Sequence, residues 1–600
     1  MICHAMRPCT VSRISHNVSR LRLEAYAYSV CRRMATGAQS QESDTNSGPE
    51  YDVSEEVAAD LFACRNPGEV LHFAVKHEGG SFPILQATIC RLQKMLPDED
   101  LQVAGAGDKA KQEQTLVPSN TSRRGWSMER AKQDGRFHVL VAALTSRLEE
   151  ASPRSLSLVA DAAARFSRPS PELKGLLDSV AESAVKRENA FAPRNLTVLA
   201  TALSTHGIGL QLRPSPADTP EGSLTAQMRL PAAAAFVRSE ALRTMQDFNP
   251  SCCAALLESL RRWGIHDKEV INMTLERAYD TLDQTRARDL VELVEISARL
   301  GVPRPALVRR LAELAAGEPE QFSAEQLVRL LYALVRSRFL SPSNLDGFLK
   351  VLRSQLGLLK ARELSNLMFV LAMCEAHHEA SLARLLVVQY YESTDAKGFE
   401  ADVDMLWSMA AFSLFSKYEE IALKTLRRTF HGDPPDNVVT LVKLHDVARS
   451  VHLHGAPLKR LLWESWRAAC SETAQREGVR LASSPAHRRL AECLDQLQYI
   501  LPGEEESGPR PFQFVRGWNI RWIPVDFYDK DLKLVIDLDT LGSPVSRTVR
   551  HHLLREYGCT PVLLDYWDWR STNSAAGRLS YLTFQLERTL CMPVIEQKKK

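Results

Sequence analysis

Two acidic residues alternate with apolar ones in the stretch LKLVIDLDTLGSP, residues 532–544. Asp537 and Asp539 are two residues apart, and alternate residues of a β-strand point to the same side. A third carboxylate, Asp526, lies in the preceding apolar segment. Carboxylate oxygens are good Mg²⁺ ligands, and a bound Mg²⁺ could help water to attack a phosphodiester. The pattern is therefore compatible with a nuclease site, or with the remnant of one in a protein that only holds RNA.

A second group of candidate residues consists of three arginines at a constant spacing. Arg262, Arg299 and Arg336 are 37 residues apart. The planar guanidinium group suits phosphate, so a row of arginines could follow an RNA backbone. Alternatively, each cation complements the macrodipole at the C-terminal end of a helix. The sequence leaves both explanations open.

The same 37-residue step governs the apolar residues around these arginines. Four segments superpose, namely CAALLESLRRWGI, LVELVEISARLGV, LVRLLYALVRSRF and LSNLMFVLAMCEA, with aligned core positions Leu256, Leu293, Leu330 and Leu367. A second helix follows the same step, and looser copies begin at Leu156, Leu196, Met405 and Leu441. Helical pairs of this length cannot bury an apolar face alone. We therefore predict a mostly α-helical protein in which residues 137–475 form an α-solenoid with a long concave binding surface.

Composition limits the remaining possibilities. The chain has 600 residues, 44% of them hydrophobic and 25% charged, which is typical of several folded domains. Its formal charge of +2 does not by itself favour nucleic acid. No apolar run is long enough to predict a membrane span. The twelve cysteines include no C-x-x-C pair, which favours reduced thiols and no metal site.

The first 40 residues have the composition of a mitochondrial transit peptide, which predicts a matrix location. They contain one acid, Glu24, and six arginines: Arg7, Arg13, Arg20, Arg22, Arg32 and Arg33. The alternatives are that this segment is a disordered basic tail, or that translation starts at Met34. Removal of residues 1–40 leaves a mildly acidic body. We expect residues 41–136 to form a helical segment with polar linkers, and we expect further polar breaks at 211–231 and 503–511.

The pattern changes to short strands near the C-terminus. We predict strands at 520–529, 532–540 and 559–567 and helices at 544–557 and 572–590, which together form a small α/β domain at 512–591. A helix and linker at 476–511 precede it, and a basic tail at 592–600 follows. Trp567 and Trp569 suit either a small core or a base-stacking surface. In the helix SRTVRHHLLREYG, the side opposite Val549 and Leu553 is either solvated or binds RNA; it carries Arg547, Arg550, His551 and Arg555.

This C-terminal region resembles the RAP domain of organellar RNA-processing factors. The resemblance rests on LKLVIDLDTLGSP followed by SRTVRHHLLREYGCTPVLLDYWDW, with an L-x-x-x-G turn at Leu554–Gly558. The 37-residue units are similar to heptatricopeptide and octotricopeptide repeats. Proteins of the Fas-activated serine/threonine kinase-like group share this layout. The chain has no Gly-rich phosphate loop or kinase lysine motif, so we expect no kinase activity.

The RAP fold is similar to that of PD-(D/E)-x-K nucleases. Pro524-Val525-Asp526 corresponds to the "PD" element, and Asp537-Leu538-Asp539 to the second element, in which Asp539 replaces the lysine. The resemblance implies a degenerate site with no favoured catalytic residue. We expect no cofactor, and Mg²⁺ only if Asp526, Asp537 and Asp539 are a true nuclease site.

These observations support a non-catalytic mitochondrial RNA-binding protein. Its expected partners are mitochondrial ribosomal or messenger RNA and mitoribosomal proteins, in RNA processing, RNA stability or mitoribosome assembly. One alternative is a metal-dependent RNA endonuclease. The other is a protein-binding scaffold of a mitochondrial ribonucleoprotein, which the mildly acidic body favours.

Overall fold

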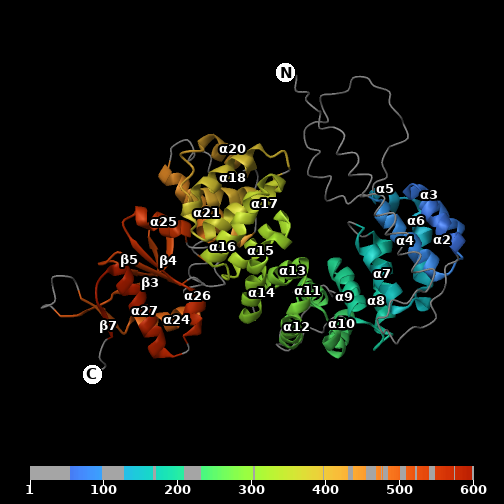
Figure 1. The fold of residues 1–600 in the computed structure, drawn as a ribbon, viewed down its shortest axis with the longest axis horizontal. Coiled ribbons are helices and arrows are strands. Elements are labelled where there is room, and N and C mark those ends of the chain that lie inside the picture. Colours follow the sequence, from blue (N-terminus) through green and yellow to red (C-terminus); the bar gives the residue numbers. More distant parts are fainter. Residues whose placement is uncertain are drawn as a thin grey trace, which may run out of the picture. The chain divides into compact units, whose positions relative to one another are not determined.

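The computed structural model describes residues 55–96, 128–166, 170–207, 232–301, 304–395, 397–429, 437–454, 466, 468–473, 476, 484–500, 508–520, 523–538, 548–572 and 574–596. The described protein is mostly helical, and its sheets are confined to the C-terminal region (Figure 1). The chain divides into two compact units, Met1–Thr285 and Arg286–Lys600, which we describe separately. Among the described helices, none is long and apolar enough to cross a membrane. The predicted transit peptide lies outside the described residues.

The first unit contains two rows of helices. In one row α4, α7, α9 and α11 pack in order, and in the other α6, α8, α10 and α12 do so. The bounds are α2 Glu55–Ala63, α3 Pro67–Lys76, α4 Phe82–Met95, α5 Met128–Lys132, α6 Gly135–Ser146, α7 Pro153–Ala164, α8 Pro171–Val185, α9 Pro193–Thr205, α10 Ala232–Thr244, α11 Pro250–Arg262 and α12 Lys268–Asp280. We call α7, α9 and α11, and their counterparts in the second unit, first helices. The helices that follow them in the chain, such as α8, α10 and α12, are second helices. The helical segment expected at 41–136 contains α2 to α5 and the start of α6.

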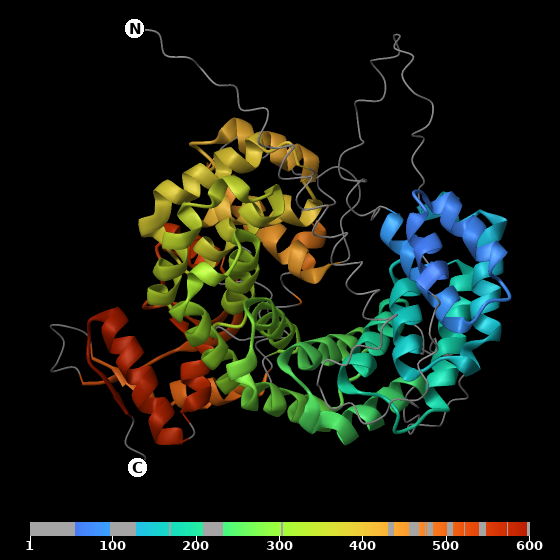
Figure 2. The ribbon, with the colours of Figure 1, turned by 45° about the vertical axis from the view of Figure 1, so that its right-hand side comes forward.

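The second unit continues the alternation of first and second helices. Its first helices α13, α15, α17, α19 and α21 pack in sequence order, and Figure 2 shows this succession from green to orange. The bounds are α13 Ala287–Arg299, α14 Pro305–Gly317, α15 Ala324–Arg336, α16 Pro342–Arg353, α17 Ala361–Met373, α18 Ala380–Glu392, α19 Phe399–Ala411, α20 Glu419–Thr429 and α21 Val438–His454.

Local sequence explains where the first helices begin and what they bury. Their starts at Pro250, Ala287, Ala324 and Ala361 keep the 37-residue step. The side chain of Asn249 caps α11, and Ser323 with Gln326 forms a capping box on α15. The aligned core leucines are all fully buried: Leu256, Leu293, Leu330 and Leu367. The helices expected at the looser copies correspond to α7, α9, α19 and α21.

The C-terminal region contains two small sheets. A four-stranded sheet has the order β3-β4-β5-β6, antiparallel except for the parallel β5–β6 pair, and a three-stranded sheet has the order β2-β1-β7. The bounds are α24 Pro485–Leu494, β1 Leu497–Tyr499, β2 Arg510–Pro511, β3 Phe514–Ile520, β4 Ile523–Asp529, β5 Leu534–Leu538, α25 Thr548–Glu556, β6 Thr560–Leu564, α26 Tyr566–Ser571, α27 Ala575–Leu590 and β7 Val594–Glu596.

The predicted strand-strand-helix-strand-helix order is present as β4, β5, α25, β6 and α27. Sequence reasoning missed β3, in which Gly517 has a positive φ of 59° and most side chains are exposed, so the apolar alternation is weak. It also missed β1 and β2, which lie in the expected helix and linker, and β7, which lies in the expected tail. Two- and three-residue strands are too short to produce a periodic pattern. The strand predicted at 559–567 ends earlier than expected, at Leu564, because α26 begins at Tyr566.

Helices cover the four-stranded sheet. Alternate residues of β5, namely Leu534, Ile536 and Leu538, join the core with residues of α24 and α27. The intervening Asp537 bonds to His551 of α25, so α25 covers the opposite face. Helix α25 also packs on α19 and α21. It therefore lies between the sheet and the last helical pairs.

Candidate nucleic-acid interface

The three candidate arginines lie where the sequence predicted, in the last turn of α11, α13 and α15. Each is exposed and has a partner one turn earlier in its own helix. Arg262 Nε donates to Glu258 Oε1 at 3.0 Å, and Arg299 lies 3.9 Å from Glu295. The guanidinium group of Arg336 lies 5.8 Å from the centre of the Tyr332 ring. Such i, i+4 contacts support the helix end, and the guanidinium groups remain accessible.

These arginines belong to a wider exposed stripe on the first helices, which we call the first-helix stripe. Four positions per helix, spaced four, three and four residues apart, repeat the order exposed, half-buried, half-buried, exposed. In the first unit they are Arg154, Leu158, Asp161, Arg165, Arg194, Val198, Thr201, Thr205, Ser251, Ala255, Glu258 and Arg262. In the second unit they are Arg288, Glu292, Glu295, Arg299, Glu325, Arg329, Tyr332, Arg336, Arg362, Asn366, Phe369 and Met373, and two of them depart from this order, since Phe369 is buried and Met373 is half-buried.

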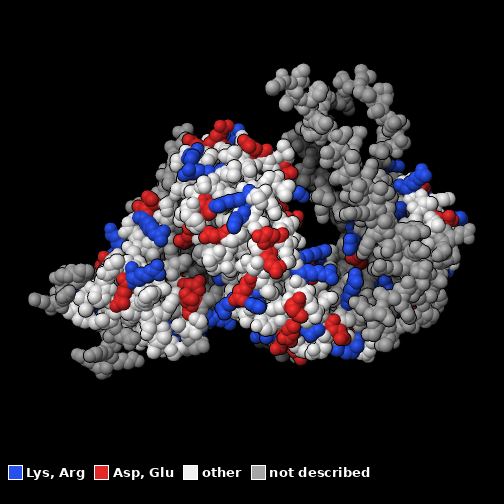
Figure 3. Space-filling view, viewed as in Figure 1, with Lys and Arg blue, Asp and Glu red and all other residues white. Residues whose placement is uncertain are grey.

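The first-helix stripe is basic in both units. It carries four arginines against two acids in the first unit and five arginines against three acids in the second. Each half therefore has a surplus of two positive charges, as large as that of the whole 600-residue chain. Figure 3 shows several Lys and Arg side chains over α9 and α11 where grey atoms leave that surface visible. Arginine is the side chain best suited to bidentate phosphate contacts.

Contacts between neighbouring helices hold part of the stripe in place. Arg262 Nη1 donates to Thr205 Oγ1 at 2.6 Å, which joins the ends of α11 and α9. Arg329 of α15 donates twice to Glu295 of α13, at 2.9 and 2.7 Å. Hydrogen bonding to this carboxylate raises the pKa of Arg329. In each unit, hydrogen bonds between neighbouring first helices thus hold some of the stripe side chains in place.

At α19 the open stripe gives way to a buried polar network. Tyr332 Oη reaches Asp404 of α19 at 3.5 Å, and Lys443 of α21 bonds to Asp404 and lies 4.3 Å from the centre of the Phe369 ring. Two of these contacts, Tyr332 with Asp404 and Lys443 with Phe369, link first helices two places apart, which are about 16–20 Å apart in a flat row. The row therefore curves toward the stripe side, and its inner face is closed there. Burial, with the nearby Asp404 carboxylate, raises the pKa of Tyr332.

The network continues into the C-terminal region. Trp407 Nε1 donates to Asp446 of α21 at 3.3 Å, and Arg550 Nε of α25 donates to the same carboxylate at 3.2 Å. His552 lies 3.0 Å from the hydroxyl of Ser413. Burial alone would raise the pKa of Asp446, but Arg550, together with His445 and Trp407, holds it below its usual value.

Only part of the side of α25 that was expected to face solvent is exposed, and for two residues the expectation was wrong. Arg550 is 7% exposed and His551 2% exposed, because one reaches Asp446 and the other Asp537. A helix that packs on both a sheet and other helices has two buried sides, whereas its sequence pattern predicted only one. Arg555 is exposed as expected. Arg547 lies outside the described residues.

The tryptophan pair does not form a described stacking surface. Trp569 is 3% exposed in the core of the sheet region, where its ring centre lies 6.4 Å from that of Tyr581. Its expected role in RNA binding is therefore contradicted, since a buried ring cannot stack on a base. The side chain of Trp567 lies outside the described part of the structure.

The two described candidate acids are closed off from solvent. Asp526 is 2% exposed and Asp537 is fully buried. The Asp526 N–H donates to Asp537 Oδ1 and the Leu538 N–H to Asp526 Oδ2, both at 2.9 Å. These bonds continue the β4–β5 connection beyond the last backbone pair, Phe527 with Ile536. The two carboxylates therefore stabilise the pairing of β4 with β5, and they do not form the solvent-accessible carboxylate pair that a nuclease needs. Asp539 lies outside the described residues.

Each of these acids also has a histidine partner that sequence reasoning missed. His487 Nε2 lies 2.9 Å from Asp526, and His551 Nε2 lies 2.9 Å from Asp537. His487 Nδ1 lies 2.7 Å from the hydroxyl of Ser484, so the order Ser-His-Asp is present. The Ser484 hydroxyl, however, caps α24 by accepting from the His487 N–H. His487 is 1% exposed, so this arrangement stabilises the fold.

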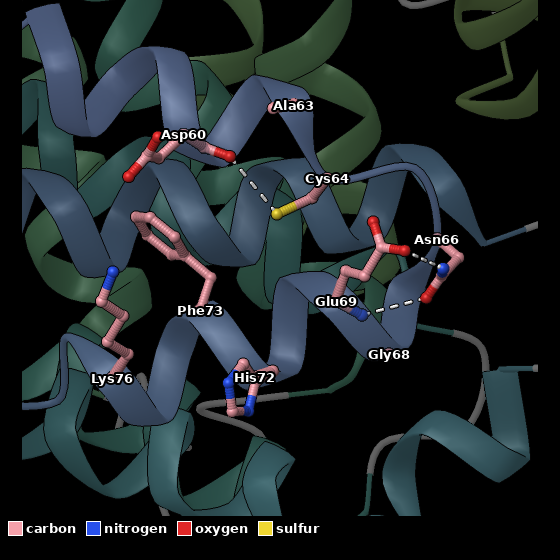
Figure 4. Close-up of a pocket in the computed structure, with 9 residues that line it drawn as sticks. All are labelled: Asp60, Ala63, Cys64, Asn66, Gly68, Glu69, His72, Phe73 and Lys76. Atoms are coloured by element: carbon pink, nitrogen blue, oxygen red, sulfur yellow. Dashed lines mark hydrogen bonds between the residues drawn. The ribbon is translucent and has the colours of Figure 1, made fainter.

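Two further local features have structural explanations. Asp346, His378 and Glu379 are close enough to share a cation, but Arg353 Nη2 donates to Glu379 at 2.5 Å. A surface hollow between α2 and α3 is lined by Asp60, Ala63, Cys64, Asn66, Gly68, Glu69, His72, Phe73 and Lys76 (Figure 4). Within it, the Cys64 thiol donates to the Asp60 carbonyl and Asn66 caps α3. Neither feature supplies a convergent set of free ligands.

Sequence reasoning missed most of the first-helix stripe. Arg154, Arg165, Arg194, Arg288, Arg329 and Arg362 occupy it beside the three candidates. A signal was available, because Arg288 and Arg362 lie 26 residues after Arg262 and Arg336. The wider column was obscured because one position carries Glu325 and another Ser251.

A comparison with protein families gives a match to part of the chain. Residues 234–379 match the family model for RNA-editing substrate-binding complex 6 protein. This part of the chain is similar to that family. The match covers about a quarter of the chain, from α10 to the 3₁₀ turn His377–Glu379, and includes Arg262, Arg299 and Arg336. A search of the curated proteins finds no match.

Proposed function

We propose that this protein binds single-stranded RNA in mitochondria and acts in RNA editing or processing. The observation that carries the proposal is the first-helix stripe, whose arginine surplus repeats along successive helices. Its spacing suits a linear polyanion, since phosphate contacts position a strand while half-buried residues meet its bases. The similarity of residues 234–379 to an RNA-editing substrate-binding family supports the same function.

The proposed mechanism is non-covalent. In each unit the helical pairs present that unit's part of the stripe, and in the second unit the C-terminal RAP-like region packs on the last helices through α25 and adds the exposed Arg555. Metal is not needed for this function, and the closed Asp526 and Asp537 give no support to cleavage. The N-terminal arginine-rich segment supports import into the matrix.

The test is binding of a fluorescent single-stranded RNA to the full chain at several salt concentrations. Replacement of Arg262, Arg299 and Arg336 by Gln should weaken binding and lower the salt slope by about 2, because each single-strand phosphate contact contributes roughly 0.7. A control replaces exposed cations of second helices, Lys174, Arg310 and Lys350, by Gln, and its slope should not change. Equal slopes for all three proteins would refute a role for the candidate arginines.

Crosslinking in cells distinguishes the remaining possibilities. Recovery of mitochondrial messenger RNA would support editing or processing, and recovery of ribosomal RNA fragments would support work at the mitoribosome. If the organellar protein yields no RNA above a mock purification, a protein scaffold becomes the better proposal. The acid partners of Arg262 and Arg299 are the feature that favours a scaffold.

A further inference from the structure

The first turns of α7 and α9 carry two arginines that the helices themselves do not need. Arg154 and Arg194 are each the second residue of their helix and are exposed. The positive end of the helix macrodipole lies there, where a cation is destabilising rather than stabilising. Helix stability therefore does not account for this placement, in contrast to the last-turn arginines.

Neither guanidinium group has a partner among the described residues. The first turns of α7, α9 and the neighbouring α11 contain no acid. By comparison, Arg165 at the other end of α7 bonds to Asp161 at 3.1 Å, and Arg262 bonds to Glu258 and Thr205. Within this face of the first unit, Arg154 and Arg194 are thus the stripe arginines whose charge no described acid neutralises.

The structure also holds the two first turns side by side. The Ser157 hydroxyl of α7 donates to the carbonyl oxygen of Asn195 in α9 at 2.8 Å. Helices α7 and α9 also pack directly against each other along their length. The two guanidinium groups therefore project from neighbouring points of one rigid surface.

We infer that Arg154 and Arg194 form a phosphate-contacting end of the RNA site in the first unit. The ligand is the phosphodiester backbone of single-stranded RNA, and the half-buried Leu158, Val198 and Thr201 meet the bases. This inference rests on the proposed function and extends it outside residues 234–379, to helices for which neither the family match nor the 37-residue arginine spacing indicates a role. Because these three residues are a mixture of polar and apolar side chains, they suit an RNA strand that is bound without strict base specificity.

The experiment uses the full chain and a fluorescein-labelled single-stranded RNA of mixed sequence. Arg154→Gln with Arg194→Gln should reduce affinity severalfold or more and lower the salt slope by about 1.4, the value for two single-strand phosphate contacts. Arg154→Lys with Arg194→Lys should keep the slope, because the charges remain. The control pair Lys174→Gln and Lys268→Gln removes two exposed cations from the starts of second helices α8 and α12 and should leave the slope unchanged.

The outcomes separate this inference from the proposed function. If the unmodified protein binds RNA and the Gln pair retains its affinity and slope, the inference fails and the function stands. If the unmodified protein does not bind RNA, the proposed function fails as well. If a polyglutamate peptide competes as effectively as RNA, the surface serves an acidic protein partner and the inference is overturned. Circular dichroism of each variant verifies folding, which exposed substitutions should not disturb.

Discussion

The ion pair between Asp446 and Arg550 should be a main attachment of the C-terminal region to the helical pairs. Asp446 is 1% and Arg550 7% exposed, and their side chains meet at 3.2 Å. Removal of one member of a buried pair leaves an uncompensated charge, which typically costs about 3–5 kcal/mol. Asp446→Asn and Arg550→Met should each destabilise the contact of α25 with α19 and α21 by that amount.

Hydrogen exchange measured by mass spectrometry on peptides from α21 and α25 suits this prediction, because a chain of two units need not unfold in one step. A loss of about 3 kcal/mol corresponds to roughly a hundredfold faster exchange. The double variant Asp446→Leu with Arg550→Met should lose less stability at this contact than the sum of the losses of the two single variants, since no charge remains buried. The exposed pair Arg310–Glu313 is the control, and Glu313→Gln should cost less than about 1 kcal/mol.

The same pair predicts a pH dependence. Arg550 holds the pKa of Asp446 below its ordinary value of 3.8, so its carboxylate binds fewer protons in the folded protein than in the unfolded one. The stabilisation is therefore complete at neutral pH and decreases as the pH falls below about 4. The role of this ion pair would be refuted if either single variant destabilised the contact of α25 with α19 and α21 by less than about 1 kcal/mol. It would also be refuted if this contact became more stable on acidification.

Three further predictions concern other parts of the chain. Asp537→Asn weakens the bonds from His551 and the Asp526 N–H, so it should reduce stability by about 1–3 kcal/mol; loss of a Mg²⁺-dependent RNA cleavage in this variant would instead show an open nuclease site. Leu330→Ala removes a fully buried core side chain and should cost about 2–5 kcal/mol in denaturant unfolding, whereas Leu358→Ala, at a 77% exposed position, should change stability by less than about 0.5 kcal/mol; similar losses would contradict the core assignment. Burial raises the pKa of the half-buried Cys90 to about 11, so iodoacetamide at pH 8 should label the exposed Cys591 well before Cys90, and equal rates would contradict the raised pKa.

Helix positions in this protein could be predicted from the sequence because they depend on local spacing. The 37-residue step located α11, α13, α15 and α17, and it placed Arg262, Arg299 and Arg336 in last turns. Apolar residues three and four positions apart define a buried side whatever lies against it. Local apolar patterns also made the order of β4, β5, α25, β6 and α27 predictable, whereas the very short β1, β2 and β7 were not.

The tertiary structure alone decided which polar residues remain accessible. Arg550 bonds to Asp446, which lies 104 residues away along the chain, and His487 contacts Asp526, which lies 39 residues away. Such partners cannot be inferred from local periodicity, so two basic residues of α25 were expected in solvent and are buried. Conversely, spacing gave only three arginines of the first-helix stripe, and the exposure of each position was needed to recognise the rest. Spacing along the chain determines the helices, but the packing of distant segments determines which charges water or RNA can reach.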